Sequence, residues 1–367
     1  MAEYKTLVKK IPVSPDKKTK QKDYLKKGRL PIVDQGQSLV GGYTDDADMA
    51  VKCELPVIVF GDHTRAVKYI TFPFGAGADG IKVLQPKENI LPLFLYYATQ
   101  YIVAKMPNRG YARHYQYVEK EDLPVPPLPE QQRIVSRIEE LFSQLDAGVE
   151  TLKKTKAQLA VYRQAVLKEA FEKVSARVLL GSISESRLGK MLDSEKNIGI
   201  PRRYLRNINV RWHSFDLSDL SEMPIEENEV DKYSLRKGDL VICEGGEPGR
   251  CAVWESDDVI FYQKALHRVR FTDSSNPKFY MYYLWYAAQT GQLKSLFTGT
   301  GIKHLTGQSL VKVLVPTAER ITQDSIVNEI ETHLSVCDSI EHTVDTALQQ
   351  AEAMRQSILK DAFEGRL

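Results

Sequence analysis

The residues whose types could do chemistry are basic, aromatic and amide side chains grouped in three polar segments. "NRGYARHYQY" (108–117) interleaves arginine and histidine with tyrosine, and "GTGIKHLTGQS" (299–309) places lysine and histidine on a glycine-rich frame. "IPRRYLRNINVRW" (200–212) adds four arginines and two asparagines. The candidate binding residues in these segments are Arg109, Tyr111, Arg113, His114, Arg202, Arg203, Arg206, Lys303 and His304.

Side chains of these types suit contact with nucleic acid. Arg, Lys, Asn and Gln read base edges in the major groove of DNA, while Lys, Ser and Thr also hold phosphates. Ordinary surface polarity would explain any one of the segments. Comparable loops at matching places in the two halves of the chain favour binding, since "RGYARHY" aligns with "GTGIKHL", with His114 against His304 and Arg113 against Lys303.

Two fragments imitate the loops of S-adenosylmethionine-dependent methyltransferases but lack the required context. "FTGTG" (297–301) and "NPKF" (276–279) are separated by a short span that reads mostly as one helix, whereas such a site needs separate strand ends of a parallel sheet. We interpret Asn276 as the cap of that helix, Pro277 as its first residue and the following glycines as its end.

Metal, nucleotide and membrane chemistry are also not indicated. The chain has no GxxxxGK[ST] phosphate loop, its seven histidines lack zinc-site spacing, and its four cysteines form no CxxC motif. No apolar run reaches about 18 residues, and the N-terminus lacks the apolar core of a signal peptide. We therefore expect a cytoplasmic binding protein that is not an enzyme, holds no metal or cofactor and contacts no membrane.

An internal sequence repeat predicts the helices that must position the three segments. "YRQAVLKEAFE" (162–172) returns as "MRQSILKDAFE" (354–364), with seven of eleven positions identical. The match extends upstream without a gap at an offset of 192 residues, for about forty residues. Apolar positions in the first copy step by threes, fours and sevens over about four heptads, which predicts a long helix with a coiled-coil seam.

Each such helix needs a partner for its apolar stripe. Two independent helices, each packed on its own domain, are one solution. Because both copies have the same length and stripe, we expect instead an antiparallel coiled coil about 65 Å long at about 1.5 Å per residue. Lysines at 153, 154 and 156 would then meet acids at 341 and 345.

The segments ahead of the helices repeat more faintly. Residues 55–70 and 239–254 both read as strand, glycine-containing turn and strand, and 91–102 and 277–290 both read as aromatic helices. The first 29 residues carry ten Lys or Arg against three acids, which indicates a solvated mobile arm or, alternatively, a polyanion contact.

The chain resembles the specificity subunits of type I restriction–modification systems. "PLPEQQRIVSRIEELFSQLD", "YRQAVLKEAFEKV" and "RQSILKDAFEGRL" resemble their two conserved helical regions. "KGDLVICEGGEPGRCAVW", "YQKALHRVR" and "PRRYLRNINVRW" resemble one of their target recognition domains. The turn PLPEQQ is not kept in the second copy, where "TAERITQDSIV" stands instead, and the first recognition domain opens with the basic arm.

The resemblance implies an α+β fold of two α/β target recognition domains joined by two long helices in an antiparallel coiled coil, with a pseudo-twofold internal repeat. It implies recognition domains at 1–124 and 176–316, and helical regions at 125–175 and 317–367. Each domain would read one half of a split sequence in double-stranded DNA, and Arg250 joins the candidate DNA-binding residues. The helices would act as a ruler and would dock methyltransferase (M) subunits, which carry S-adenosylmethionine, and restriction (R) subunits would complete the complex.

A coiled-coil protein–protein scaffold that binds no nucleic acid is the alternative, and an enzyme with a cryptic site is a third. Salt-dependent binding to duplex DNA separates the first interpretation from the other two, because phosphate contacts release counterions.

Overall fold

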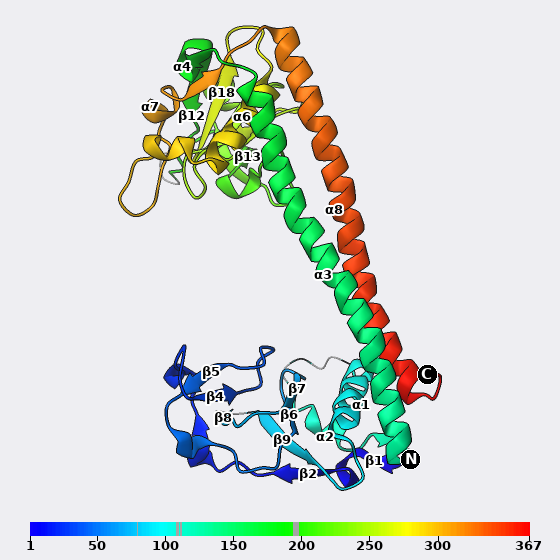
Figure 1. The fold of residues 1–367 in the computed structure, drawn as a ribbon. Helices are drawn as coiled ribbons and strands as arrows, with labels where there is room; N and C mark the ends of the chain where they lie inside the picture. The colour runs from blue at the N-terminus through cyan, green and yellow to red at the C-terminus, as the bar shows by residue number, and fades with distance from the viewer. Residues whose placement is uncertain (79, 108–109, 111, 194–197) are drawn as a thin grey trace. The chain divides into compact units, whose positions relative to one another are not determined.

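The computed structural model describes residues 1–78, 80–107, 110, 112–193 and 198–367. The chain forms two compact units (Figure 1). Unit 1 comprises Met1–Lys154 and Val344–Leu367, and unit 2 comprises Thr155–Thr343. Both long helices, α3 (Leu128–Glu172) and α8 (Arg320–Phe363), cross the boundary, so each unit contains one globular domain and part of each helix. Among the described ranges, none of the helices is both long and apolar enough to cross a membrane.

Unit 1 contains two four-stranded sheets and one aromatic helix. The first sheet is antiparallel, with the order β2 (Val8–Ile11), β9 (Ile81–Pro86), β6 (Val57–Gly61) and β7 (Val67–Ile70). The second has the order β3 (Lys18–Thr19), β8 (Gly75–Gly77), β4 (Leu30–Val33) and β5 (Gly42–Thr44). Helix α1 (Pro92–Lys105) lies between the first sheet and α3 (Figure 1). Strand β6 is apolar along its whole length and fully buried, as expected for the centre of a two-sided core.

Unit 2 repeats this order of strands. Its antiparallel sheet runs β12 (Ser184–Leu188), β18 (Leu266–Phe271), β15 (Leu240–Cys243) and β16 (Cys251–Val253). Its second sheet runs β14 (Ser221–Ile225), β13 (Ile200–Leu205) and β17 (Phe261–Tyr262), and its aromatic helix is α6 (Pro277–Gln289). The strand–turn–strand and aromatic-helix predictions are therefore confirmed in both halves, and so is the fold class.

The remaining elements are short. They are β1 (Ala2–Glu3), β10 (Asp122–Leu123), β11 (Arg177–Leu179), β19 (Leu314–Pro316), α2 (Tyr115–Val118), α4 (Leu180–Ile183), α5 (Val230–Tyr233) and α7 (Gly307–Leu310). Strand β1 pairs with β10, and β11 pairs in the same way with β19.

The basic N-terminal segment is part of the fold, which corrects the prediction of a mobile arm. Strand β2 pairs with β9, and Tyr4 is fully buried with its hydroxyl 2.8 Å from Thr99 Oγ1. The positive charges of this segment masked the apolar residues between them, Tyr4, Leu7 and Val8, which are buried.

Helix α6 begins and ends as the sequence predicts. The Asn276 side chain accepts a hydrogen bond from the backbone N–H of Lys278 at 2.9 Å, and Pro277 is the first helical residue. Gly291 follows the helix with φ of 77°, the left-handed conformation that glycine adopts without strain.

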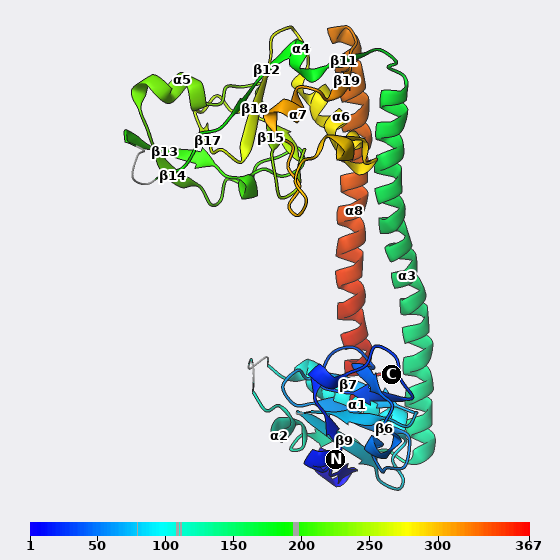
Figure 2. The same ribbon diagram turned by 90° about the vertical axis from the view of Figure 1, so that its left-hand side faces the viewer.

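The long helices run antiparallel in each unit (Figures 1 and 2), and the repeated motif supplies equivalent ion pairs. In unit 2, Arg163 of α3 lies 2.7 Å from the Asp338 carboxylate of α8. In unit 1, Arg355 of α8 pairs with Asp146 of α3. Since 163 + 192 = 355 and 146 + 192 = 338, the same arginine and the same aspartate meet twice. The predicted meeting of mid-helix charges is confirmed by Lys156, whose Nζ lies 3.5 Å from Glu341 Oε1.

The repeated phenylalanine explains why the same helix ending appears twice. Phe171 packs on α6, with ring centroids 5.4 Å from Phe279 and 5.3 Å from Tyr283. Phe363 packs on α1, 5.2 Å from Phe94 and 5.4 Å from Tyr101. Each long helix therefore begins after one globular domain and ends by packing against the aromatic helix of the other unit's domain.

A buried glutamine near the start of each long helix bonds to the start of the aromatic helix of its own unit. Gln131 Oε1 accepts from the backbone N–H of Leu91 at 2.9 Å, and Gln323 Oε1 accepts from that of Asn276 at 2.7 Å. Each amide nitrogen also donates at 2.9 Å to a carbonyl five residues earlier in the chain. The second copy thus keeps the glutamine although it lacks the PLPEQQ turn.

Candidate nucleic-acid interface

A cleft in unit 2 collects residues from the two polar segments of this half, 200–212 and 299–309, and from the turn that follows β15. Its volume is about 530 Å³. Its lining residues are Met191, Leu192, Asn207, Glu244, Gly245, Gly246, Gln263, Lys264, Ala265 and His304. The loop after β13, the turn after β15 and the loop that leads to α7 therefore converge here.

Asn207 is the most highly connected side chain of this cleft. Its Oδ1 accepts from Arg250 Nη2 at 2.7 Å, and its Nδ2 donates to the Gly245 carbonyl at 2.7 Å. Arg250 Nη2 also donates to the Asn207 carbonyl at 3.1 Å, and Arg250 Nη1 donates to Glu247 at 3.0 Å. Arg250 therefore orients Asn207, and only 17% of its side chain is exposed.

Glu244 connects the cleft to the core of unit 2. Its carbonyl accepts from the backbone N–H of Leu305 at 2.7 Å, which holds the 299–309 loop against the β15 turn. Its carboxylate lies 3.7 Å from Nε2 of His267. Burial lowers the pKa of His267 to about 4, so this imidazole is neutral near pH 7.

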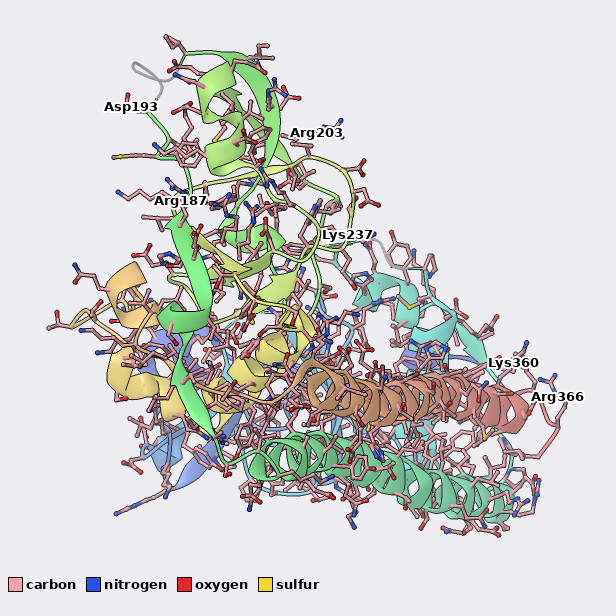
Figure 3. The ribbon with its side chains drawn as sticks, turned by 90° about the horizontal axis from the view of Figure 1, so that it is seen from above. Arg187, Asp193, Arg203, Lys237, Lys360 and Arg366 are labelled. Carbon is pink, nitrogen blue, oxygen red and sulfur yellow. The ribbon has the colours of Figure 1, made fainter. Side chains whose placement is uncertain are left out.

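The other predicted binding residues of unit 2 differ in whether they bond to other residues of the domain. Arg206 Nη2 donates to the Asp219 carbonyl at 2.7 Å, and Arg202 Nη2 lies 3.3 Å from Glu227 Oε2. Lys303 is exposed and donates to the Gly299 carbonyl at 2.7 Å, within its own loop. Arg203 is exposed on β13 and lies at the periphery of unit 2 (Figure 3).

The predicted binding residues of unit 1 differ in their exposure to solvent. Arg109 and Tyr111 lie outside the described residues. Arg113 is exposed, whereas His114 is fully buried with Nδ1 3.0 Å from the Asp62 carbonyl. We therefore correct the assignment of His114, because a side chain closed off from solvent in this way positions the loop and presents nothing to a ligand.

The alignment of His114 with His304 is wrong by two residues. His114 precedes α2 and Thr306 precedes α7, and these short helices are related by the same offset of 192 as the long ones. Backbone bonds agree, since Lys5 N–H donates to the Glu119 carbonyl and Gly181 N–H donates to the Val311 carbonyl, which is 119 + 192. Arg113 and Lys303 are therefore not equivalent positions.

The sheet order reveals an equivalence that sequence reasoning missed. Gln35 stands two residues after the end of β4, as Asn207 stands two residues after the end of β13, and the two strands occupy matching places in their sheets. Lys82 and Asp62, 3.4 Å apart, likewise match His267 and Glu244. The only sequence signal for Gln35 was its place after a short apolar strand, which pointed to no particular chemistry.

Within the part of the chain that the structure describes, no group of three or more His, Cys, Asp or Glu side chains could hold a metal ion. Burial raises the pKa of the Cys243 thiol to about 11 and raises that of the Cys251 thiol well above its usual range, so neither is a reactive thiolate. The cleft offers amide, carboxylate, lysine and histidine side chains, which can form hydrogen bonds with a ligand.

Comparisons with known proteins identify chains that are similar to this one. Residues 10–160 match the family model described as the type I restriction modification DNA specificity domain. The specificity subunit of the type I restriction enzyme EcoKI from Escherichia coli K12 is 26% identical over 273 residues, which are 67% of this chain and 58% of that protein. The chain therefore spans 58% of the length of this curated relative.

Two solved structures share the fold. A chain from a structure concerned with complex assembly and conformational transition of the type I R-M system superposes with a TM-score of 0.76 at 17% identity. That comparison covers all of this chain and 97% of the other. The HsdS subunit from Thermoanaerobacter tengcongensis gives a TM-score of 0.56 at 18% identity, over all of this chain and 96% of the other.

Proposed function

We propose that this chain, which is similar to the type I restriction–modification specificity subunits, recognises a bipartite sequence in double-stranded DNA. The observation that carries the proposal is the cleft of unit 2, where Arg250 and Gly245 hold the side chain of Asn207 in the loop after β13. Amide, carboxylate, lysine and histidine groups converge there, as direct readout of base edges requires.

We propose that unit 1 reads the other half of the sequence. Its strands follow the same order, and Gln35 stands where Asn207 stands in unit 2. Because the two loops carry different residues, the two half-sites should differ in sequence.

Exposed basic residues would supply the contacts to phosphates. Arg113 of unit 1 and Arg203 and Lys303 of unit 2 are exposed, and cations of this kind position a protein on the duplex without reading bases. Arg202, Arg206 and Arg250 already bond to their own domain, so we assign them to holding the loops, and His304 to the wall of the cleft.

We propose that the chain itself is noncatalytic and works in the cytoplasm as part of a larger complex. The long helices would dock methyltransferase subunits, which supply S-adenosylmethionine chemistry, and restriction subunits would join them. The helices would also set the spacing between the two half-sites.

The test is a salt titration of binding to duplex DNA by the full chain. Each phosphate contact contributes about −0.9 to the slope of log K against log salt, so a specificity subunit with several contacts gives a steep slope. Arg203→Ala should reduce the slope by about one unit while the recognised sequence stays the same. A chain with no affinity for duplex at low salt would instead be the protein–protein scaffold.

A domain exchange tests the split readout. Residues 176–316 are replaced by the second recognition domain of another family member, and methylated adenines are mapped in cells that also express the methyltransferase subunit. One half of the motif should change and the other half should remain. A change in both halves, or in neither, would contradict independent reading.

A further inference from the structure

We infer that Asn207 is a base-reading residue of unit 2 and that the base it reads is adenine. The inference rests on the proposed function and assigns within it one side chain and one base. It is carried by the bonds that Asn207 already makes, by the space beside it and by the charge of its neighbour.

The side-chain carboxamide of Asn207 is held in one orientation, and two of its four possible hydrogen bonds are made within the domain. A carboxamide oxygen accepts two hydrogen bonds and its nitrogen donates two. Arg250 uses one lone pair of Oδ1 at 2.7 Å, and the Gly245 carbonyl uses one N–H of Nδ2 at 2.7 Å. One acceptor site of Oδ1 and one N–H of Nδ2 remain without a partner among the described residues, on a carboxamide that Arg250 and Gly245 hold in place.

The approach to this carboxamide is kept open by a glycine. A Cβ at Gly246 would lie 3.7 Å from both Oδ1 and Nδ2 of Asn207, so any side chain there would stand in front of the amide. Gly246 has φ of 75°, a conformation that glycine adopts without strain. Asn207 and Gly246 both line the cleft, which has a volume of about 530 Å³.

A neighbouring donor and acceptor match one base edge in the major groove. Adenine presents the N7 acceptor beside the N6 amino donor, whereas guanine presents two acceptors, cytosine one donor and thymine one acceptor. Glu244 lines the same cleft, and a carboxylate there favours a base with an amino group, which is adenine or cytosine. Of these two bases, only adenine also offers the acceptor that a carboxamide N–H needs.

Arg250 acts through Asn207 and is a positioning residue. Its guanidinium bonds to the carbonyl and the side chain of Asn207 and to Glu247. Since most of this side chain is buried, Arg250 is unsuited to reading a base itself.

The experiment enriches sequences from a pool of randomised duplexes with the full chain. The wild-type chain should enrich a motif with adenine at one position that depends on Asn207. Asn207→Ala should lower the preference at that position by roughly 5- to 150-fold, the range for one bidentate contact, and leave the other positions unchanged. Asn207→Asp replaces both N–H donors of Nδ2 by an acceptor oxygen, which also removes the bond to the Gly245 carbonyl, and should abolish the preference for adenine at that position.

Two further variants separate reading from positioning and from folding. Arg250→Ala should relax the same position without changing the salt slope, because no phosphate contact is lost. Lys237→Ala is the matched control, since Lys237 is exposed in unit 2, outside the cleft, and pairs with Asp257 at 3.3 Å. The control should enrich the wild-type motif, and urea unfolding shows whether each variant is folded.

The possible outcomes distinguish a failure of this inference from a failure of the proposed function on which it rests. A wild-type chain that enriches no motif would overturn the proposed function, and the inference with it. A wild-type motif that Asn207→Ala and Asn207→Asp leave unaltered at every position would overturn the inference alone. Loss of preference spread over a whole half-site in all three Asn207 and Arg250 variants would also overturn it, because the loop would then be a structural support.

Discussion

Gln323 provides a sharp test of how the long helices hold the globular domains. The Gln323 side chain is 2% exposed, accepts from the Asn276 N–H at 2.7 Å and donates to the Ala318 carbonyl at 2.9 Å. Gln323→Leu keeps the volume but leaves both backbone groups without these partners. A buried polar group without a partner costs about 1–3 kcal/mol. Because Asn276 and Ala318 are half-buried, we expect unit 2 to lose about 2–4 kcal/mol of stability.

The chain contains its own reporter for this measurement. All three tryptophans, Trp212, Trp254 and Trp285, lie in unit 2. Tryptophan fluorescence during urea unfolding therefore follows unit 2, while far-ultraviolet circular dichroism follows both units. With a slope of about 2 kcal/mol/M, the fluorescence midpoint of Gln323→Leu should fall by about 1–2 M.

The repeat supplies the matched control. Gln131→Leu removes the equivalent bonds in unit 1, to Leu91 N–H and the Pro126 carbonyl, and should leave the fluorescence midpoint near that of the wild-type chain while shifting the circular dichroism. An unchanged midpoint in Gln323→Leu would refute the structural role of the glutamine. Equal fluorescence shifts in both variants would refute the assignment of each glutamine to its own unit.

The remaining predictions concern pH, the second half-site and the spacing of the half-sites. Burial lowers the pKa of His213 and His267 to about 4, so below pH 6.5 the unfolded chain binds protons that folded unit 2 does not. Stability should therefore fall as pH drops from about 6.5 to 4, by about 2 kcal/mol per histidine at pH 5, and His267→Gln should remove about half of this loss in urea unfolding followed by tryptophan fluorescence. Gln35→Ala should relax one position of the enriched motif in the half-site that Asn207→Ala does not affect; a change in the same half-site would contradict the equivalence of the two loops. Four helix-favouring residues inserted after Gln158 add roughly 6 Å of helix and should lengthen the spacer by about one or two base pairs, part of which local unwinding can absorb. Sequencing the methylated motif measures the spacer, and an unaltered spacer with full activity would mean that the helices are not the ruler.

Features that depend on local spacing were predictable from the sequence. The stripe of apolar residues gave both long helices, and Asn276-Pro277 marked the start of α6 to the residue. Periodicity and capping act over a few neighbours, so one chain segment contains the information. The ion pair between Lys156 and Glu341 followed because the repeat placed both charges near the helix midpoints.

Features that depend on partners distant in the chain were not predictable. From the sequence, Arg250 was predicted to contact DNA. Its bonds to Asn207 were not predictable because the two residues are 43 positions apart in the chain. The match of His114 with His304 rested on residue identity, whereas backbone hydrogen bonds align His114 with Thr306. Gln35 became a candidate only through the order of strands in two sheets.

The division of unit 1 between two distant stretches of chain affects the order in which the protein is completed on the ribosome. Residues 155–343 form unit 2 as one continuous stretch, whereas unit 1 needs residues 344–367, which are synthesised after all of unit 2. At about 5–20 residues per second, the roughly 190 intervening residues take about 10–40 s. During that time Phe94 and Tyr101 of α1 lack Phe363, the ring that later covers them. The N-terminal unit is therefore the last to be finished, with an apolar surface open to chaperones or to aggregation while the rest of the chain is made.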